Sequence, residues 1–82
     1  MITEINEQVK VKAVFSRGDV KILAILWNDR LMPVDEITYR WYTRQGIYPV
    51  YHFAVSSNKT VMELCFNPVK LLWRLDKIHD EL

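Results

Sequence analysis

The chain has 82 residues, half of them hydrophobic, and a formal net charge of +1, so it should form one domain and is excluded from the intrinsically disordered class. Its only cysteine, Cys65, excludes an intramolecular disulfide and favours a reducing compartment. The longest apolar run, residues 22–27, is too short to cross a bilayer, so we expect a cytoplasmic protein that does not enter a membrane.

The start of the chain is mostly polar, and Glu4 and Glu7 interrupt any apolar run there. We therefore expect residues 1–8 to be a loose N-terminal arm without a secretory signal, followed by a single β domain over residues 9–82. From Val9 to Phe15, apolar residues alternate with lysines, which is typical of a half-buried strand.

The next segment, residues 20–27, is apolar at almost every position and follows a turn centred on Gly18. Because alternation is absent, this strand should be either covered on both faces or part of a subunit contact. A two-residue turn at Asn28–Asp29 should follow it and pair Trp27 with Arg30.

Residues 36–55 are rich in aromatic side chains and predict a β-hairpin around Gly46. A three-residue loop, 44–46, pairs Tyr39 with Tyr51 and makes one face of the hairpin apolar. A two-residue loop at Gln45–Gly46 would reverse the face of one strand, so we prefer the longer loop. The apolar face would then hold Ile37, Tyr39, Trp41, Tyr51 and Phe53.

The rest of the chain predicts two more strands, separated by turns at 56–59 and 67–70. This register places both His52 and Arg74 beside Glu63. Asn67–Pro68 is also a good helix start, so a short C-terminal helix stays open. Its apolar stripe would be Leu71, Leu75, Ile78 and Leu82. The fold class that we predict is all-β, a small antiparallel barrel or roll of six or seven strands.

The order of these segments resembles a family of small bacterial all-β domains of unknown function. The similar segments lie at 26–30, 51–55, 63–67 and 73–78, with Trp41 between the first two. In that family the first turn is commonly Trp-x-Gly-Arg, whereas Asp29 replaces the glycine here. The resemblance implies an all-β fold and a strand over 73–78, and it implies no activity.

The polar face of the predicted hairpin combines arginines with tyrosines. Between residues 40 and 74 the chain carries five basic residues against Glu63 alone, a local charge of about +4. Small β-barrels bind single-stranded nucleic acid by stacking bases on aromatic side chains in a basic groove. We therefore expect a non-catalytic binding module, most concretely for single-stranded nucleic acid, although a solvated surface has the same pattern. The expected contacts are Arg40, Tyr42, Arg44, Tyr48, His52 and Arg74.

Two other functions remain open. The apolar segment 20–27 and open strand edges would suit a protein-interaction or self-assembly domain, for example a homodimer. A small enzyme using His52 and Glu63 is the least supported, because a positioned nucleophile and an orienting group are missing. We therefore expect no catalytic residues.

Cys65 and the two histidines form no recognisable metal or redox motif. His52, Cys65 and His79 are far apart in the sequence, whereas a metal site needs three or four clustered ligands. We expect a structural cysteine and neither a metal nor a cofactor. Arg17-Gly18-Asp19 matches an adhesive tripeptide, but these residues also suit a hairpin turn, which we prefer.

Overall fold

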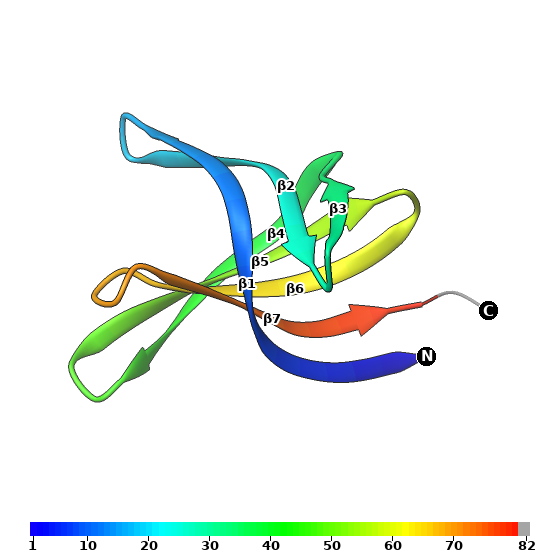
Figure 1. Ribbon diagram of the computed structural model, residues 1–82. Coiled ribbons are helices and arrows are strands. Elements are labelled where there is room, and N and C mark those ends of the chain that lie inside the picture. Colours follow the sequence, from blue (N-terminus) through cyan, green and yellow to red (C-terminus); the bar gives the residue numbers. More distant parts are fainter. Residues whose placement is uncertain (81–82) are drawn as a thin grey trace.

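A computed structural model describes residues 1–80 of the chain. Its strands are β1 (Ile2–Ser16), β2 (Asp19–Trp27), β3 (Arg30–Pro33), β4 (Glu36–Gln45), β5 (Tyr48–Ser57), β6 (Thr60–Asn67) and β7 (Leu72–His79). They form one antiparallel sheet in the order β3-β2-β1-β7-β6-β5-β4, which is open because it starts at β3 and ends at β4 (Figure 1). The predicted all-β fold is confirmed, with seven strands in a rolled sheet. Within residues 1–80 there is no helix that is long and apolar enough to cross a membrane.

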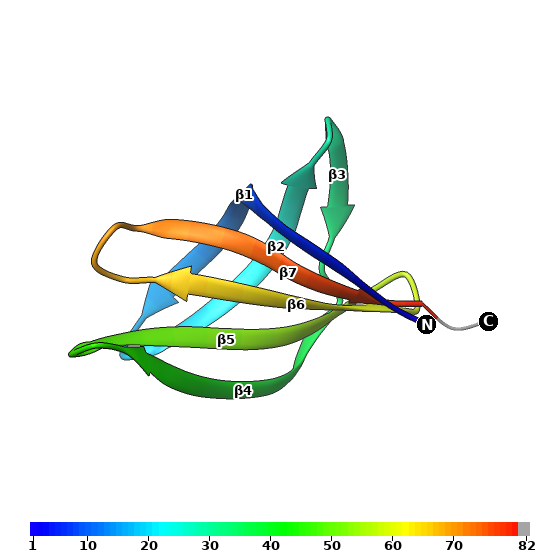
Figure 2. The same cartoon turned by 90° about the horizontal axis from the view of Figure 1, so that it is seen from below.

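The long strand β1 makes the roll, because its two halves pair with different strands. Its first half, up to Val9, pairs with β7, and its second half, from Lys10 on, pairs with β2. Figures 1 and 2 show β1 turning away from β7, so that β2 and β3 lie across the sheet of β4 to β7. The inner face of that sheet, which we define as the face toward β2, carries the core, and its opposite face is the outer face.

The prediction of a loose arm over residues 1–8 is wrong. Ile2 pairs with His79, and Glu4 pairs with Lys77. Ile5 also packs against the hydrophobic core. The polar composition of residues 1–8 does not exclude a strand, because a strand can be polar along one face. The edge of β7 also needs a partner strand for its backbone N–H and C=O groups.

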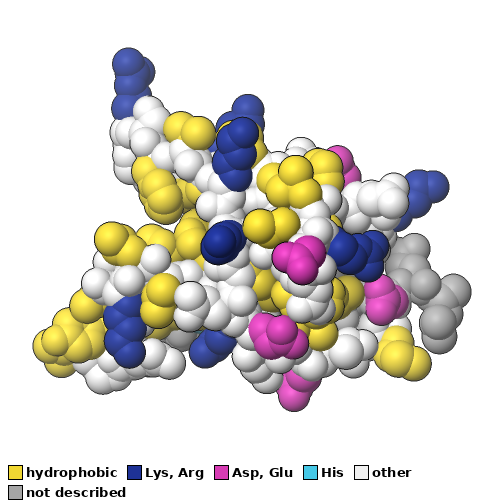
Figure 3. All heavy atoms as spheres, viewed as in Figure 1, with side chains coloured by type: hydrophobic (Ala, Val, Ile, Leu, Met, Phe, Trp, Pro, Cys, Tyr) yellow, Lys and Arg dark blue, Asp and Glu magenta, His cyan; other side chains and the backbone are white. Residues whose placement is uncertain are grey.

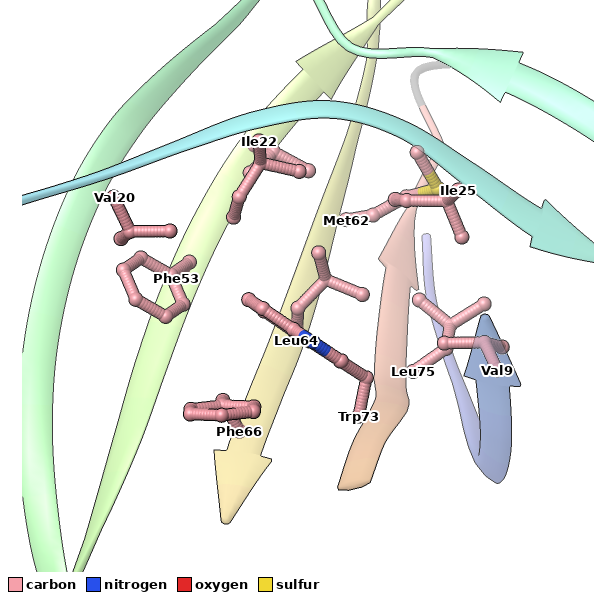
Figure 4. Packing of buried hydrophobic residues seen from close by; sticks show 11 residues of the cluster. Val9, Val20, Ile22, Ile25, Phe53, Met62, Leu64, Phe66, Trp73 and Leu75 are labelled. Carbon is pink, nitrogen blue, oxygen red and sulfur yellow. The ribbon is translucent and has the colours of Figure 1, made fainter. Parts of the chain in front are cut away.

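The core lies between β2 and the inner faces of β5, β6 and β7 (Figure 4). Its buried members are Val9, Val20, Ile22, Ile25, Phe53, Val55, Met62, Leu64, Phe66, Trp73 and Leu75. The Trp73 ring packs against Phe66 with centroids 4.7 Å apart and against Phe53 at 5.8 Å.

Strand β2 is an interior strand in which Val20, Ile22, Ala24 and Ile25 are buried while Lys21 and Leu26 are exposed, so its two faces are covered only in part. It lies between β3 and β1, and its register with β1 skips Leu23. The irregularity lets Ile22 and Ile25 both join the core although they are three residues apart. The tight turn that follows is confirmed, with Trp27 paired with Arg30.

The predicted register of the β4–β5 hairpin is wrong. The loop has two residues, Gly46 and Ile47, and Gln45 pairs with Tyr48. Gly46 has φ +63° at the first loop position, as a type II′ turn requires. The shift is an odd number of residues, so it exchanges the two faces of β4. Arg40, Tyr42 and Arg44 lie on the inner face, whereas Tyr39, Trp41 and Thr43 lie on the outer face.

A bulge restores the apolar pattern at the start of β4. The register skips Thr38, so that Ile37 pairs with the buried Val55 while Arg40 pairs with Phe53. Beyond the bulge, β4 extends past the core. Arg40 therefore reaches solvent although it lies on the inner face.

The later hairpins have the predicted faces, but their registers are shifted by two residues, and by three in the part of the β6–β7 pair beyond its irregularity. Asn58 and Lys59 form a two-residue turn, so Glu63 pairs with Ala54 and His52 pairs with Cys65. In the same way Arg74 pairs with Cys65 rather than lying beside Glu63. Because a shift of two is even, the core residues stay on the inner face.

The C-terminal segment is a strand, as the preferred prediction had it, and the helix alternative is wrong within the described residues. Asn67 does cap a turn, since its Oδ1 accepts the backbone N–H groups of Val69 and Lys70 at 2.9 and 3.1 Å. Leu71 then takes φ +57° and the chain turns back into β7. Leu82, the last residue of the predicted helical stripe, lies outside the described residues.

Candidate functional site

A groove of about 690 Å³ opens between the end of the β1–β2 hairpin and the β4–β5 hairpin. Residues 15–20 line one side, residues 40–42 and 51–53 line the other, and Phe66 and Pro68 complete it. Figure 3 shows hydrophobic side chains in the hollow below the β1–β2 hairpin, at the upper left. The groove exists because the sheet is open and these hairpins extend beyond the core.

Three aromatic rings in this groove remain open to solvent. Phe15 is 59% exposed, Tyr42 66% and Tyr51 42%. Tyr42 and Tyr51 are cross-strand partners on the inner face, and Phe15 contacts the buried Phe66 with ring centroids 5.5 Å apart. Exposed aromatic rings on facing walls can stack with a planar ligand.

An ion pair links the two walls of the groove. Arg40 Nη1 of β4 donates to Asp19 Oδ1 at the start of β2, 2.5 Å away. Both side chains are largely exposed, so solvent screens the pair and its contribution to stability is small. Arg17 lines the same groove, and Arg44 shares the inner face of β4 with Arg40. Neither Arg17 nor Arg44 forms an ion pair with any other described residue.

The Asp19–Arg40 pair predicts a measurable titration. The hydrogen bond from Arg40, together with the Val20 backbone N–H, holds the pKa of the Asp19 carboxyl below its usual value of 3.8. A folded pKa below the unfolded one stabilises the fold above the unfolded pKa, and this contribution is lost as the pH falls through the folded pKa. We expect carboxyl NMR to show a low Asp19 pKa that returns toward 3.8 in Arg40→Gln. An unchanged Asp19 pKa in this variant would contradict the ion pair.

A second group of functional side chains lies on the outer face, across β5, β6 and β7. His52 of β5 and Arg74 of β7 both pair with Cys65 of β6. The Trp41 ring stacks on the His52 ring, with centroids 5.1 Å apart and planes 8° from parallel. His52 Nε2 also hydrogen-bonds with the Thr43 hydroxyl at 2.8 Å. Burial lowers the pKa of His52 and raises that of the Cys65 thiol.

Asp76 joins this group through an irregularity in β7. The register with β6 skips Asp76 between Leu75 and Lys77. Arg74 Nε donates to Asp76 Oδ1 at 2.5 Å, and this hydrogen bond raises the pKa of the Arg74 guanidinium. One ligand atom each from His52, Cys65 and Asp76 lies within 4.8 Å of the other two. We name these three residues the outer-face cluster; they are the described residues that could hold a metal ion.

The six contacts predicted from the sequence are divided between the two faces. Arg40, Tyr42 and Arg44 belong to the inner face. Tyr48, His52 and Arg74 belong to the outer face, so the predicted continuous surface does not exist. His52 is also separated from Glu63, whose carboxylate instead pairs with His79 Nε2 at 2.5 Å.

The prediction missed Phe15, Arg17 and Tyr51 as groove residues, and Asp76 as a neighbour of Cys65. Phe15 and Arg17 come from a hairpin distant in sequence, so only the bend of β1 brings them to Tyr42. Gly46 was the one signal available for Tyr51, because a type II′ turn starting at this glycine gives the observed register.

Comparisons of the chain with protein-family models, with curated proteins and with solved structures found no match. The resemblance to a family of small bacterial all-β domains therefore stays a prediction.

Proposed function

We propose that the protein is a non-catalytic binding module and that its groove binds single-stranded nucleic acid. The observation that carries this proposal is the row of exposed rings, Phe15, Tyr42 and Tyr51, in a groove with basic residues. Every nucleobase has a π-face, so stacking on such rings needs no particular sequence.

The charges of the groove suit a phosphate backbone. Arg40 is already held by Asp19, so its charge is largely neutralised and its part in the groove is structural. Arg17 of the groove lining, and Arg44 farther along the inner face of β4, supply the positive charge for phosphates. The sequence predicted that Arg40 binds phosphate directly, whereas in the structure its charge is paired with Asp19. This division also leaves Tyr48 and Arg74 outside the nucleic-acid site, whereas His52 of the outer face still borders the groove.

Tyr39 and Tyr42 provide a matched test of this proposal. Both belong to β4 and are 66% exposed, but only Tyr42 faces the groove. Removing an aromatic platform costs about 1–3 kcal/mol per stacked base, or about 5- to 150-fold in affinity. We expect Tyr42→Ala to weaken binding of fluorescent oligothymidylate by this amount at low salt, and Tyr39→Ala to leave it unchanged. Anisotropy titrations measure both affinities. No binding by the unmodified protein, or equal losses in the two variants, would refute the proposal.

The open edge of β4 supports a second candidate, a protein-interaction or self-assembly domain. β4 is a terminal strand of ten residues, and such an edge can pair with a strand of another chain. From the sequence, the apolar segment 20–27 was expected to form the contact with another chain. In the structure this segment is the interior strand β2, and most of its apolar residues are buried. Light scattering over micromolar concentrations tests self-assembly, and a constant monomer mass would exclude it.

A further inference from the structure

We propose that the outer-face cluster, His52, Cys65 and Asp76, is a binding site for a divalent transition-metal ion of the zinc type. The ligands belong to the outer face of the sheet, where only His52 also borders the groove, and the site does not depend on nucleic-acid binding. Its ligand atoms are already within 4.8 Å of one another. In a tetrahedral zinc site, bonds of about 2.0–2.3 Å place neighbouring ligand atoms about 3.3–3.8 Å apart. Small side-chain rotations therefore suffice to close the site.

The backbone of the site is rigid. The three ligands come from the neighbouring strands β5, β6 and β7, and His52 and Cys65 are direct cross-strand partners. β6 and β7 each have a paired strand on both sides, which restricts backbone movement. A preformed arrangement of this kind reduces the ordering that binding would require.

The surroundings of the ligands orient them for a metal. Metal-bound histidines usually use their second ring nitrogen for a hydrogen bond that fixes the ring. Here the Thr43 hydroxyl occupies Nε2 of His52, which leaves Nδ1 to bind the ion, and Trp41 stacks on the ring. Arg74 Nε similarly holds Oδ1 of Asp76, so Oδ2 of this carboxylate can face the ion.

The donor set determines the class of ion. A thiolate, an imidazole and a carboxylate suit Zn²⁺ or Co²⁺, whereas Mg²⁺ and Ca²⁺ prefer oxygen ligands only. On binding, the Cys65 thiol loses its proton to solvent and the sulfur forms a bond to the ion. The thiolate and the carboxylate then balance the two charges of the ion, and Arg74 remains as the outer partner of Asp76. The three ligands leave a fourth position for water or a small ligand.

Cobalt titration of the whole untagged chain tests the site. Cys65 is the only cysteine in the sequence, so any thiolate-to-cobalt charge-transfer absorption reports on this residue alone. We expect this absorption to saturate at one equivalent of Co²⁺ and to disappear when Zn²⁺ displaces the cobalt. Absence of the band, or cobalt binding without it, would overturn the proposal.

Two variants with a matched control separate the site from general metal binding. Even the loss of an outer-shell partner commonly weakens metal binding 10- to 100-fold, so Asp76→Asn and His52→Gln should each weaken Co²⁺ binding at least about tenfold. His79→Gln serves as control, because His79 is the other histidine of the chain and pairs with Glu63 instead. Circular dichroism verifies that each variant is folded. If Asp76→Asn, which keeps the size of the side chain, binds Co²⁺ as tightly as the unmodified protein, the cluster is not the site.

Discussion

Leu75→Ala should destabilise the domain by about 2–5 kcal/mol, the range for truncating a fully buried leucine. Leu75 has no solvent exposure and is paired with Leu64, which is equally buried. β7 lies between β1 and β6, so both neighbours hold its backbone and the cavity cannot easily collapse. Small domains have a free energy of unfolding of about 5–15 kcal/mol, so this one substitution removes a large part of it.

Leu31→Ala is the matched control for this prediction. Leu31 of β3 is 67% exposed, and exposed substitutions usually change stability by less than about 0.5 kcal/mol. Urea unfolding followed by tryptophan fluorescence gives both values. Similar stability of the two variants would show that Leu75 is not in the core.

Removal of residues 2–8 should have the second large effect, because these residues form half of β1. The deletion strips the partner from β7 between Arg74 and His79 and removes the packing of Ile5 against the core. Each lost hydrogen bond contributes about 0.5–1.5 kcal/mol net, so the total should reach several kcal/mol. A loose arm would instead be removed at almost no cost.

Two measurements evaluate this deletion. Urea unfolding should give a midpoint well below that of the full chain. In the full chain, amide hydrogen exchange should show protection in both the N-terminal half of β1 and β7, because paired amides exchange only after opening. Rapid exchange over residues 2–8, together with an unchanged unfolding midpoint, would support a loose arm.

The turns explain why much of the fold could be predicted from the sequence. Asn28 and Asp29 both have positive φ, and this two-residue turn fixes the Trp27–Arg30 pair as predicted. Strand positions followed from alternation, and a strand at 73–78 was preferred over a helix and confirmed. These signals are local, so they are readable without knowledge of tertiary contacts.

The candidate sites could not be predicted in the same way, because they depend on register and bulges. The criterion of one fully apolar face fails for β4, whose far end leaves the core and places Arg40 and Tyr42 on the inner face. The skipped residues Thr38 and Asp76 have no distinctive sequence signal. The groove also requires the bend of β1, which brings Phe15 near Tyr42.

The register of β4 on β5 connects the two proposals. It places Tyr42 in the groove and Trp41 against His52 on the opposite face. A nucleic-acid ligand and a metal ion would therefore occupy separate faces of the same hairpin. His52 borders the groove and is also a ligand of the outer-face cluster, but the proposed nucleic-acid contacts and the metal ligands are different residues, so failure of one proposal leaves the other in place.

NMR of the isotope-labelled protein during titration with a short oligothymidylate tests the central claim most directly. Aromatic-ring resonances report each face separately. We predict saturable shifts at Phe15, Tyr42 and Tyr51, which line the groove, and no shifts at Tyr39 and Tyr48, which belong to the outer face and do not line it. Shifts confined to Tyr39 and Tyr48, or no shifts at any ring at saturating oligonucleotide, would contradict a nucleic-acid-binding groove between the two hairpins.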